Sequence, residues 1–306
     1  MSRLQTPDNL SLKHRCYLSL VCWLARLPLP VLQSMGAVVG RLVYLCSASF
    51  RRLFDANLTQ ALGPNAVRLH SVHAQAESGK AVFELPWLWL HPRDETLKTL
   101  QQVEGWEHVQ RARAAGKGIL FLTPHLGCFE ITAQYAASQP EASPITVLFR
   151  PPRQPWAESM LRFGRTRAGM QIAPADLSGV RRLIRALKSG ESVGLLPDQV
   201  PPAGQGAWLP WFGKPAYTMT LAARLAQTGA SVIFACAERL PKGQGFVLSC
   251  RPPASPLPVD DLEATAAAIN QELMKLISSC PEQYFWGYNR YKTPRGSSEK
   301  PPEKPL

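Results

Sequence analysis

The chain alternates short apolar runs with longer segments whose apolar positions recur at helical spacing. Runs of apolar or β-branched residues have the length and composition of strands covered on both faces. They predict strands at 119–123, 145–149, 192–196, 231–237 and 246–250. The segments between favour helices at 104–115, 127–138, 155–168, 178–189 and 217–228. Gly190 and Gly229 follow the last two and suit the left-handed C-cap position. The pattern predicts an α/β fold with a mixed sheet covered by helices.

The N-terminal pattern differs, because it consists of two apolar stretches separated by prolines. Residues 16–27 form an apolar run that is about 18 Å long if helical, short of a bilayer core of about 30 Å. Pro28 and Pro30 interrupt it, and a second stretch at 31–46 follows. We expect a kinked helix pair that dips into the membrane, or one span with an interfacial partner. A buried hairpin of a soluble protein is the alternative. A signal peptide is disfavoured because an Ala-x-Ala-like site is missing.

These patterns divide the chain into three regions. Residues 1–52 are predicted to form the membrane anchor and interfacial helices, and residues 53–292 one catalytic domain. Residues 293–306 are rich in proline and charge and lack apolar periodicity, which predicts disorder.

The net charge limits the partners. The chain has 34 Lys and Arg against 22 Asp and Glu, a formal charge of +12, which favours nucleic acid, acidic lipid headgroups or an acidic carrier protein. Nucleic acid is disfavoured, since zinc-finger spacing and RNP-like signatures are missing. A cytoplasmic membrane face accounts for the same charge. Arg181, Arg182, Arg185 and Lys188 line one side of the 178–189 segment, either as a solvated face or as a docking patch for an acidic carrier protein or phospholipid headgroups.

The segment 118–131, "GILFLTPHLGCFEI", carries the candidate chemistry. His125 follows a strand-like run, and Glu130 lies five positions later, about 140° away on a helix, so the two cannot meet if both are helical. We therefore expect His125 in a turn eased by Gly127, with a helix that returns Glu130 beneath the imidazole. Glu130 then accepts the Nδ1 proton and leaves Nε2 as a base for a hydroxyl, which predicts acyl transfer. A covalent route through Cys128 is the alternative.

Other chemistries lack their signatures. The seven cysteines form no Cys-x-x-Cys pair, which fits a reducing compartment. His125 has no second histidine at ligand spacing, so no metal is predicted. Nucleophile-elbow, dinucleotide-binding and P-loop glycine motifs are missing as well, and no organic cofactor is implied.

An ordered set of sequence blocks resembles one known family. The blocks are "FDANLTQALG" (54–63), "VEGWEHVQRARAAGKGILFLTPHLGCFE" (103–130), "VLFRPP" (147–152), "LRFGRTRAG" (161–169), "LIRALKSGESVGLLPDQ" (183–199), "WLPWFGKPAYTMTLAARLA" (208–226) and "PEQYFWGYNRYK" (281–292). The chain resembles the late acyltransferases of lipid A biosynthesis, the lauroyl or myristoyl transferases of the lysophospholipid acyltransferase superfamily. The resemblance implies a glycerolipid acyltransferase-like fold.

The resemblance also implies roles for particular residues. His125 becomes the general base and Glu130 its partner, while Arg165 and Asp198 line the same cleft and Arg150 is a weaker candidate of that kind. We expect Asp198 to orient Arg165 rather than to act as an acid. The segment after Asp198, "QVPPAGQGAWLPWFG", departs from the more compact turn of relatives, which leaves its substrate contacts open.

The partners follow from the same resemblance. The implied donor is an acyl carrier protein thioester, with acyl-CoA as the alternative. The implied acceptor is a hydroxyl of a 3-hydroxyacyl chain on an anionic lipid A precursor, at the cytoplasmic face of the inner membrane, in contact with its phospholipids. Acylation of a lysophospholipid or aminolipid stays open, as does a non-catalytic lipid-binding homologue. In the aromatic block 284–292, we expect Phe285 and Trp286 to be core residues and Arg290 to contact phosphate.

Overall fold

The computed structural model describes residues 11–141, 143–152, 154–166, 169–296 and 302. The N-terminal part is helical, with α1 (Leu12–Leu24), α2 (Leu29–Cys46), α3 (Ala48–Leu62), α4 (Ala66–Leu90) and α5 (Arg93–Leu97). The helices that follow are α6 (Trp106–Ala114), α7 (Phe129–Ser138), α8 (Pro155–Arg165), α9 (Leu177–Lys188), α10 (Leu221–Ala226) and α11 (Leu262–Ser279). Short 3₁₀ turns are η1 (Pro241–Gly243) and η2 (Pro281–Gln283).

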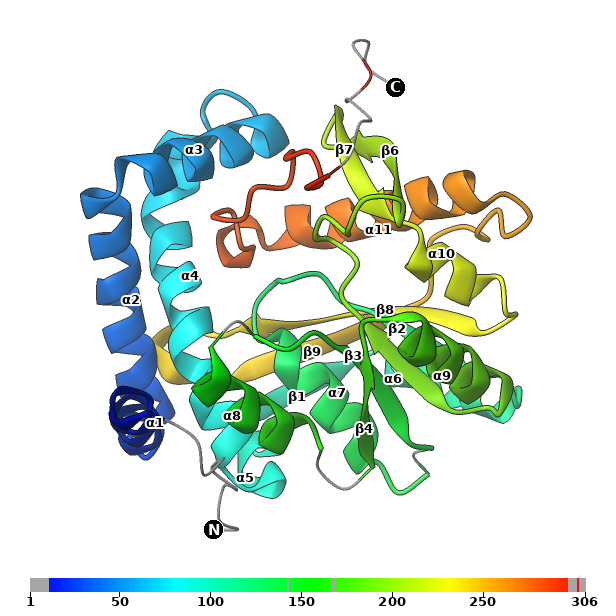
Figure 1. The fold of residues 1–306 in the computed structure, drawn as a ribbon, viewed down its shortest axis with the longest axis horizontal. Helices are drawn as coiled ribbons and strands as arrows, with labels where there is room; N and C mark the ends of the chain where they lie inside the picture. Colours follow the sequence, from blue (N-terminus) through cyan, green and yellow to red (C-terminus); the bar gives the residue numbers. More distant parts are fainter. Residues whose placement is uncertain (1–10, 142, 153, 167–168, 297–301, 303–306) are drawn as a thin grey trace.

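A mixed seven-stranded sheet crosses the molecule in the order β1-β9-β8-β2-β5-β3-β4 (Figure 1). Its strands are β1 (Leu100–Glu104), β2 (Ile119–Leu122), β3 (Ile145–Phe149), β4 (Met170–Pro174), β5 (Ser192–Leu195), β8 (Ser231–Arg239) and β9 (Phe246–Arg251). Pairing is parallel except between β8 and β9. A separate antiparallel hairpin is formed by β6 (Gly206–Trp211) and β7 (Lys214–Met219).

Two hydrophobic layers cover this sheet because successive side chains of each strand point to opposite faces. In β2, Leu120 and Leu122 pack with α9, α10 and α11 on one face. Ile119 and Phe121 pack with α6 and α7 on the other. The central strands are thus buried on both faces, which explains their continuous apolar runs. Figure 1 shows these helices on either side of the sheet.

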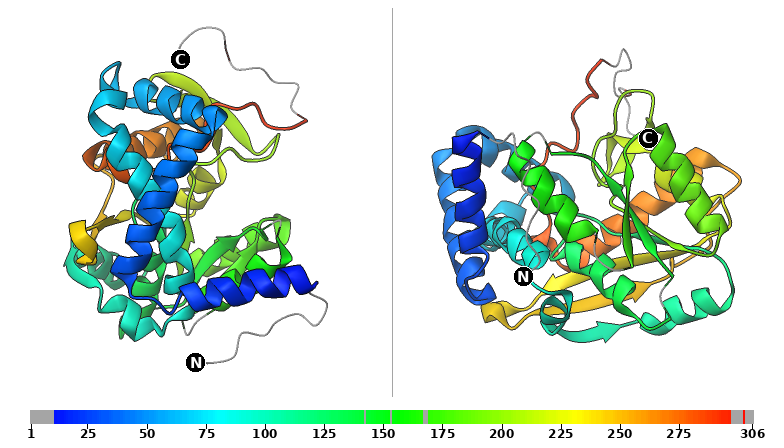
Figure 2. Two further views of the ribbon diagram at one scale, coloured as in Figure 1. Left: turned by 90° about the vertical axis from the view of Figure 1, so that its left-hand side faces the viewer. Right: turned by 60° about the horizontal axis from the view of Figure 1, so that its bottom comes forward.

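Helix α2 packs lengthwise against α4 at the edge of the molecule (Figure 2). Three glycines allow the approach: a Cβ on Gly36 would lie 2.6 Å from the Gly79 carbonyl oxygen, and one on Gly40 would lie 2.2 Å from that of Gln75. Among the described residues, α2 is the one helix long and apolar enough to cross a bilayer. Its outward side exposes Val38, Leu42 and Leu45.

The predicted α/β class is confirmed, and the five predicted strands correspond to β2, β3, β5, β8 and β9. The two N-terminal helices are confirmed as α1 and α2. The helix expected at 217–228 is wrong at its start, since Tyr217 to Met219 belong to β7 and only Leu221–Ala226 is helical. The 127–138 helix begins at Phe129, after the turn. The 155–168 helix ends at Arg165, and residues 167–168 lie outside the described part.

The sequence patterns missed the edge strands β1 and β4, the separate hairpin of β6 and β7, and the long helices α3, α4 and α11. In β1, two consecutive glutamines separate Leu100 from Val103, and β6 contains Pro210. The division of the chain at residue 52 stays a prediction, as does the disordered tail, since most of 293–306 lies outside the described residues.

Candidate active site

The candidate site lies at one edge of the sheet, where parallel neighbouring strands end. β2 pairs with β5 in parallel, and β5 pairs in the same way with β3. Since parallel strands end at the same edge, the residues that follow them converge. His125 follows β2, Asp198 follows β5, and Arg150 follows β3. The topology therefore brings together residues 73 positions apart in the chain.

His125 is held by Asp198 through two contacts. The imidazole Nδ1 lies 2.8 Å from Asp198 Oδ1, and the His125 backbone N–H donates to Oδ2 at 3.0 Å. Asp198 is 1% exposed, whereas the His125 side chain keeps 22% of its surface accessible. A carboxylate accepts only, so it fixes the tautomer in which Nδ1 carries the proton and Nε2 carries the lone pair.

The expected contact between Glu130 and His125 is wrong. Glu130 instead binds Arg165, whose Nε donates to both carboxylate oxygens at 3.1 and 3.2 Å and whose Nη2 also donates. Helix α7 begins only at Phe129, so Glu130 lies in its first turn and faces α8. The two acids have exchanged their expected partners, because Asp198, predicted to orient Arg165, binds the imidazole.

Asp198 is ionised despite its burial. Burial alone raises the pKa of this carboxyl, but the adjacent His125, which donates two hydrogen bonds to it, and the charge of Arg290 bring the pKa below its usual value. Burial, together with the charge of the nearby Asp198 carboxylate, raises the pKa of Tyr284 well above its ordinary range. Tyr284 thus stays protonated.

Arg290 is buried and bound to protein atoms, so the expectation that it contacts a phosphate is wrong. It is 3% exposed, donates to Tyr217 O and Thr218 Oγ1 at 2.8 Å each, and lies 4.8 Å from the centroid of the Trp211 ring. Burial lowers its pKa, in spite of the neighbouring tyrosines and Asp198. Its positive charge lies inside the protein and lowers the pKa of Asp198. Trp286 is buried at 2% exposure, as expected of a core residue, whereas Phe285 is only half-buried and lies outside the core clusters.

Residues 281–292, which follow α11, hydrogen-bond the backbone on both sides of the site. Phe285 N–H donates to His125 O at 3.2 Å, and Gly127 N–H donates to Gln283 O at 3.1 Å. On the other side, Val200 N–H donates to the Tyr288 hydroxyl at 2.9 Å. Gly127 has φ of +57°, and a Cβ there would lie 2.1 Å from Ala237 O, so only glycine fits this turn.

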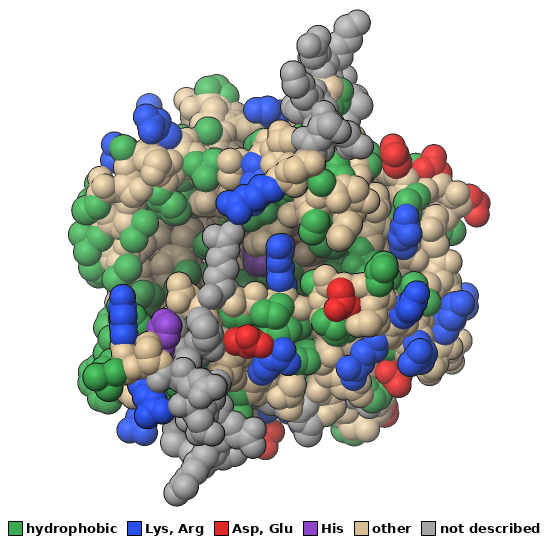
Figure 3. Space-filling model, in the orientation of Figure 1, with side chains coloured by type: hydrophobic (Ala, Val, Ile, Leu, Met, Phe, Trp, Pro, Cys, Tyr) green, Lys and Arg blue, Asp and Glu red, His purple; other side chains and the backbone are tan. Residues whose placement is uncertain are grey.

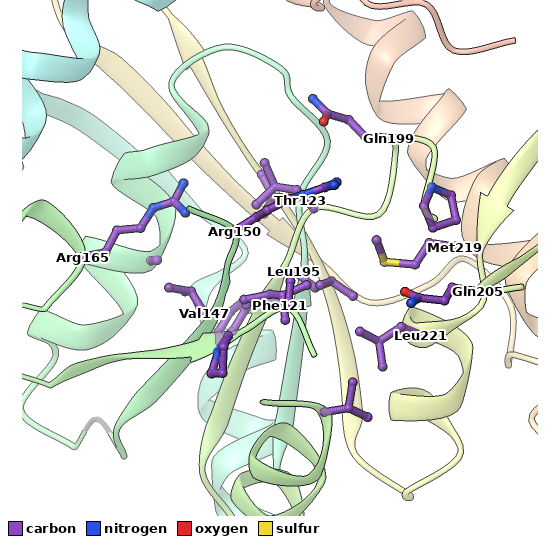
Figure 4. A pocket seen from close by; sticks show the side chains of 18 of the residues that line it. Phe121, Thr123, Val147, Arg150, Arg165, Leu195, Gln199, Gln205, Met219 and Leu221 are labelled. Carbon is purple, nitrogen blue, oxygen red and sulfur yellow. The ribbon is translucent and has the colours of Figure 1, made fainter. Parts of the chain in front are cut away.

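A pocket of about 830 Å³ opens beside the free nitrogen of His125. Phe121, Val147, Leu195 and Met219 contribute to a largely apolar wall (Figure 4). Glu130, Arg150 and Arg165 also line it, so the predicted site residues other than Asp198 share one cavity with His125. Gln199, which sequence reasoning missed, places its amide nitrogen 3.2 Å from His125 Nε2. Its position directly after Asp198 was the available signal.

The alternative chemistries receive no support from the geometry. Cys128 is 2% exposed, and burial raises the pKa of its thiol well above the ordinary value, so the thiolate needed for covalent catalysis is disfavoured. Among the described residues, no group of three or more His, Cys, Asp or Glu side chains is arranged to hold a metal ion. The site therefore consists of an oriented imidazole beside an apolar cavity, with cations nearby.

An imidazole positioned by a buried carboxylate at a lipid-sized cavity is suited to acyl transfer to a hydroxyl. The family described as bacterial lipid A biosynthesis acyltransferase matches residues 11–293, and the chain belongs to that family. The expected enzyme class, an O-acyltransferase, is confirmed by this membership.

Several relatives come from Escherichia coli strain K12. The chain is 30% identical to a lipid A biosynthesis lauroyltransferase over 279 residues, covering 89% of each chain. It is 26% identical to a lipid A biosynthesis palmitoleoyltransferase over 287 residues, covering 91% of each. It is 24% identical to a lipid A biosynthesis myristoyltransferase over 199 residues, covering 65% of this chain and 61% of the relative.

Proposed function

We propose that this protein transfers a fatty acyl chain from an acyl carrier protein thioester to a hydroxyl of a 3-hydroxyacyl chain on a lipid A precursor. His125 is the general base. The observation that carries this proposal is the Asp198 carboxylate on Nδ1, which leaves Nε2 unprotonated beside the apolar pocket. Family membership supports the substrate class.

The reaction follows from this geometry. The acceptor hydroxyl gives its proton to Nε2 as its oxygen attacks the thioester carbonyl carbon, and Asp198 stabilises the imidazolium that forms. When the tetrahedral intermediate collapses, the thiolate leaves and takes the proton from Nε2. The ester and the free thiol are the products, and the imidazole returns to its starting state.

Arg165 and Arg150 provide positive charge for an anionic acceptor. Both line the pocket, Arg165 from the end of α8 and Arg150 just after β3 (Figure 4). Glu130 holds the Arg165 guanidinium in place through a two-pronged contact, which fixes its orientation before substrate arrives. The lipid A precursor carries phosphate groups, for which an oriented guanidinium is well suited.

The basic side of α9 provides a docking surface for the acyl donor. Arg181, Arg185 and Lys188 are exposed on this helix, and exposed Arg224 of α10 lies at the edge of the pocket. Leu177 and Val180, at the start of α9, also line the pocket, so a carrier bound there delivers its acyl chain over a short path. Figure 3 shows Lys and Arg side chains around the central hollow and over the region of α9.

The exposed apolar side of α1 and α2 provides the membrane contact. Leu20, Trp23, Leu42 and Leu45 are each at least half exposed. Because α2 packs along α4, which carries Glu77, Lys80 and Glu84, we propose that the helices lie in the interface of the inner membrane at its cytoplasmic face rather than cross it. Figure 3 shows apolar side chains along the edge where these helices lie.

Purified protein given a lipid A precursor and a lysophospholipid side by side, with acyl carrier protein thioester as donor, tests the proposal. We expect a secondary ester on the lipid A precursor, detected by mass spectrometry, and its loss in His125→Ala. Acylation of the lysophospholipid alone would overturn the substrate assignment. Unchanged lipid A acylation by His125→Ala, in cells without other copies of the enzyme, would overturn the assigned base.

A further inference from the structure

Gln199 is the group that meets the reactive nitrogen of His125. Its Nε2 lies 3.2 Å from His125 Nε2, and its side chain lines the pocket (Figure 4). The amide orientation follows from the tautomer. Since Nδ1–H donates to Asp198, Nε2 of the imidazole accepts, and the neighbouring atom of Gln199 is therefore the amide N–H₂ donor.

The backbone around Gln199 is held on both sides. Asp198 precedes it and is fixed by His125, and Val200 follows it and donates to the Tyr288 hydroxyl at 2.9 Å. Asp198 and Val200 are buried, whereas Gln199 is only half-buried and faces the cavity. The side chain is thus free to change its partner while its backbone stays in place.

This hydrogen bond occupies the position that a substrate proton needs. A base cannot accept a proton from a hydroxyl while its lone pair accepts from an amide, so the acceptor hydroxyl must displace Gln199 from Nε2. The displaced N–H₂ group stays attached to a backbone that is held in place, next to the nitrogen that the hydroxyl must approach. Arg165 also lines the pocket, but Glu130 holds its guanidinium through Nε and Nη2, whereas Gln199 meets the reactive nitrogen directly.

We propose that Gln199 is a catalytic residue that donates a hydrogen bond to the oxyanion of the tetrahedral intermediate, a role that rests on the acyl transfer proposed above. As the acceptor oxygen bonds to the carbonyl carbon, its proton moves to Nε2 and the C=O electron pair moves to the carbonyl oxygen. The Gln199 N–H stabilises that negative charge. Collapse of the intermediate expels the thiolate, which takes the proton from Nε2, and the amide returns to the imidazole.

Three substitutions at this position separate the roles. Gln199→Ala removes the donor, Gln199→Glu keeps the shape and replaces the donor with an acceptor, and Gln199→Asn shortens the side chain by one methylene but keeps the amide. We expect kcat to fall about 10²- to 10³-fold for Ala, and at least as far for Glu, with little change in KM for donor or acceptor. Asn should retain part of the rate. Gln244→Ala, an exposed glutamine between β8 and β9, is the control.

Two outcomes would overturn the role. If Gln199→Ala raises kcat/KM for the acceptor, the amide is only an obstacle to binding. If Ala and Glu reduce the rate no more than Gln244→Ala does, it is no donor to the intermediate. His125→Ala run with the same substrates separates this from failure of the proposed function: an active wild type, inactive His125→Ala and active Gln199→Ala reject the Gln199 role alone.

A second measurement does not depend on variants. Long-range ¹H–¹⁵N spectra of the wild-type protein report which imidazole nitrogen carries the proton. We expect His125 protonated at Nδ1, with Nε2 as an acceptor, at pH values where the enzyme is active. A proton on Nε2 in the neutral ring would reverse the orientation of the amide and overturn the assignment of Gln199 as donor.

Discussion

Asp198 Oδ1 lies 2.8 Å from His125 Nδ1, although 73 residues separate the two in the chain. The same carboxylate accepts the backbone N–H of His125 at 3.0 Å, so it fixes both the position and the tautomer of the imidazole. Glu130, five residues after the histidine, pairs with Arg165 instead. The hydrogen-bonded pair at the centre of the site is thus a product of sheet topology.

Replacement of Asp198 by Asn should impair chemistry more than binding. An amide in this place no longer stabilises the imidazolium and can hydrogen-bond the wrong tautomer. We expect kcat to fall about 10²- to 10⁴-fold while KM for the lipid acceptor changes little. Steady-state kinetics with lipid A precursor measure this. Glu130→Gln should lower kcat less than Asp198→Asn does. A larger fall in kcat for Glu130→Gln would indicate that Glu130, and not Asp198, is the catalytic partner of His125.

Because the pKa of Asp198 is lowered in the folded protein, the free energy of unfolding should depend on pH. A group whose pKa is lower in the folded than in the unfolded protein stabilises the fold above its unfolded pKa, about 3.9 for Asp, and loses that contribution as pH falls through the folded value. Denaturant unfolding of wild type should therefore lose free energy below about pH 4. Asp198→Asn should show a shallower loss, and identical profiles would contradict the assignment.

Removal of one member of the Glu130–Arg165 pair should destabilise the protein. The carboxylate is 6% exposed and the arginine side chain 17%, so Glu130→Ala leaves a poorly hydrated guanidinium. We expect a loss of roughly 3 to 5 kcal/mol in the free energy of unfolding. The double variant Glu130→Ala with Arg165→Met should lose less than the sum of the single variants. Strict additivity in denaturant titrations would show that the pair is uncoupled.

The proposed carrier surface predicts a change confined to one donor. Arg181→Glu with Arg185→Glu should raise KM for acyl carrier protein thioester, because the surface then repels an acidic carrier, and should leave kinetics with acyl-CoA nearly unchanged. The matched control is Lys98→Glu with Arg111→Glu, the same change of charge at exposed residues elsewhere. Equal effects of the two pairs on KM would place the docking surface elsewhere than α9.

The apolar side of α2 should govern membrane binding. Leu42→Glu with Leu45→Glu places two charges on its exposed face, and we expect weaker co-sedimentation with vesicles of anionic phospholipid. Val259→Glu, an exposed apolar position outside these helices, is the control. Retained binding by the α2 variant would contradict the assigned surface. Protease access from both sides of a sealed vesicle would show that the helix crosses the bilayer.

Much of the fold was predictable from local pattern. The central strands are apolar throughout because both faces are covered, and that composition marks them in the sequence. The edge strands of the sheet and the separate hairpin lack this apolar composition. Strand β1 has only partly buried or exposed residues, and β6 contains a proline, so their pairing depends on neighbours. Helix α11 was missed although Asp261 caps it and Ile269, Leu273 and Ile277 recur at helical spacing.

The sequence by itself determined the alternation of elements, the apolar N-terminal helices, the turn at Gly127 and the exposure of one imidazole after a buried strand. Only the tertiary structure decided which acid holds that imidazole and which amide meets its free nitrogen. The reason is that hydrophobic periodicity is a local property, whereas the convergence of His125, Asp198 and Gln199 depends on β2 and β5 being parallel neighbours that end at the same edge.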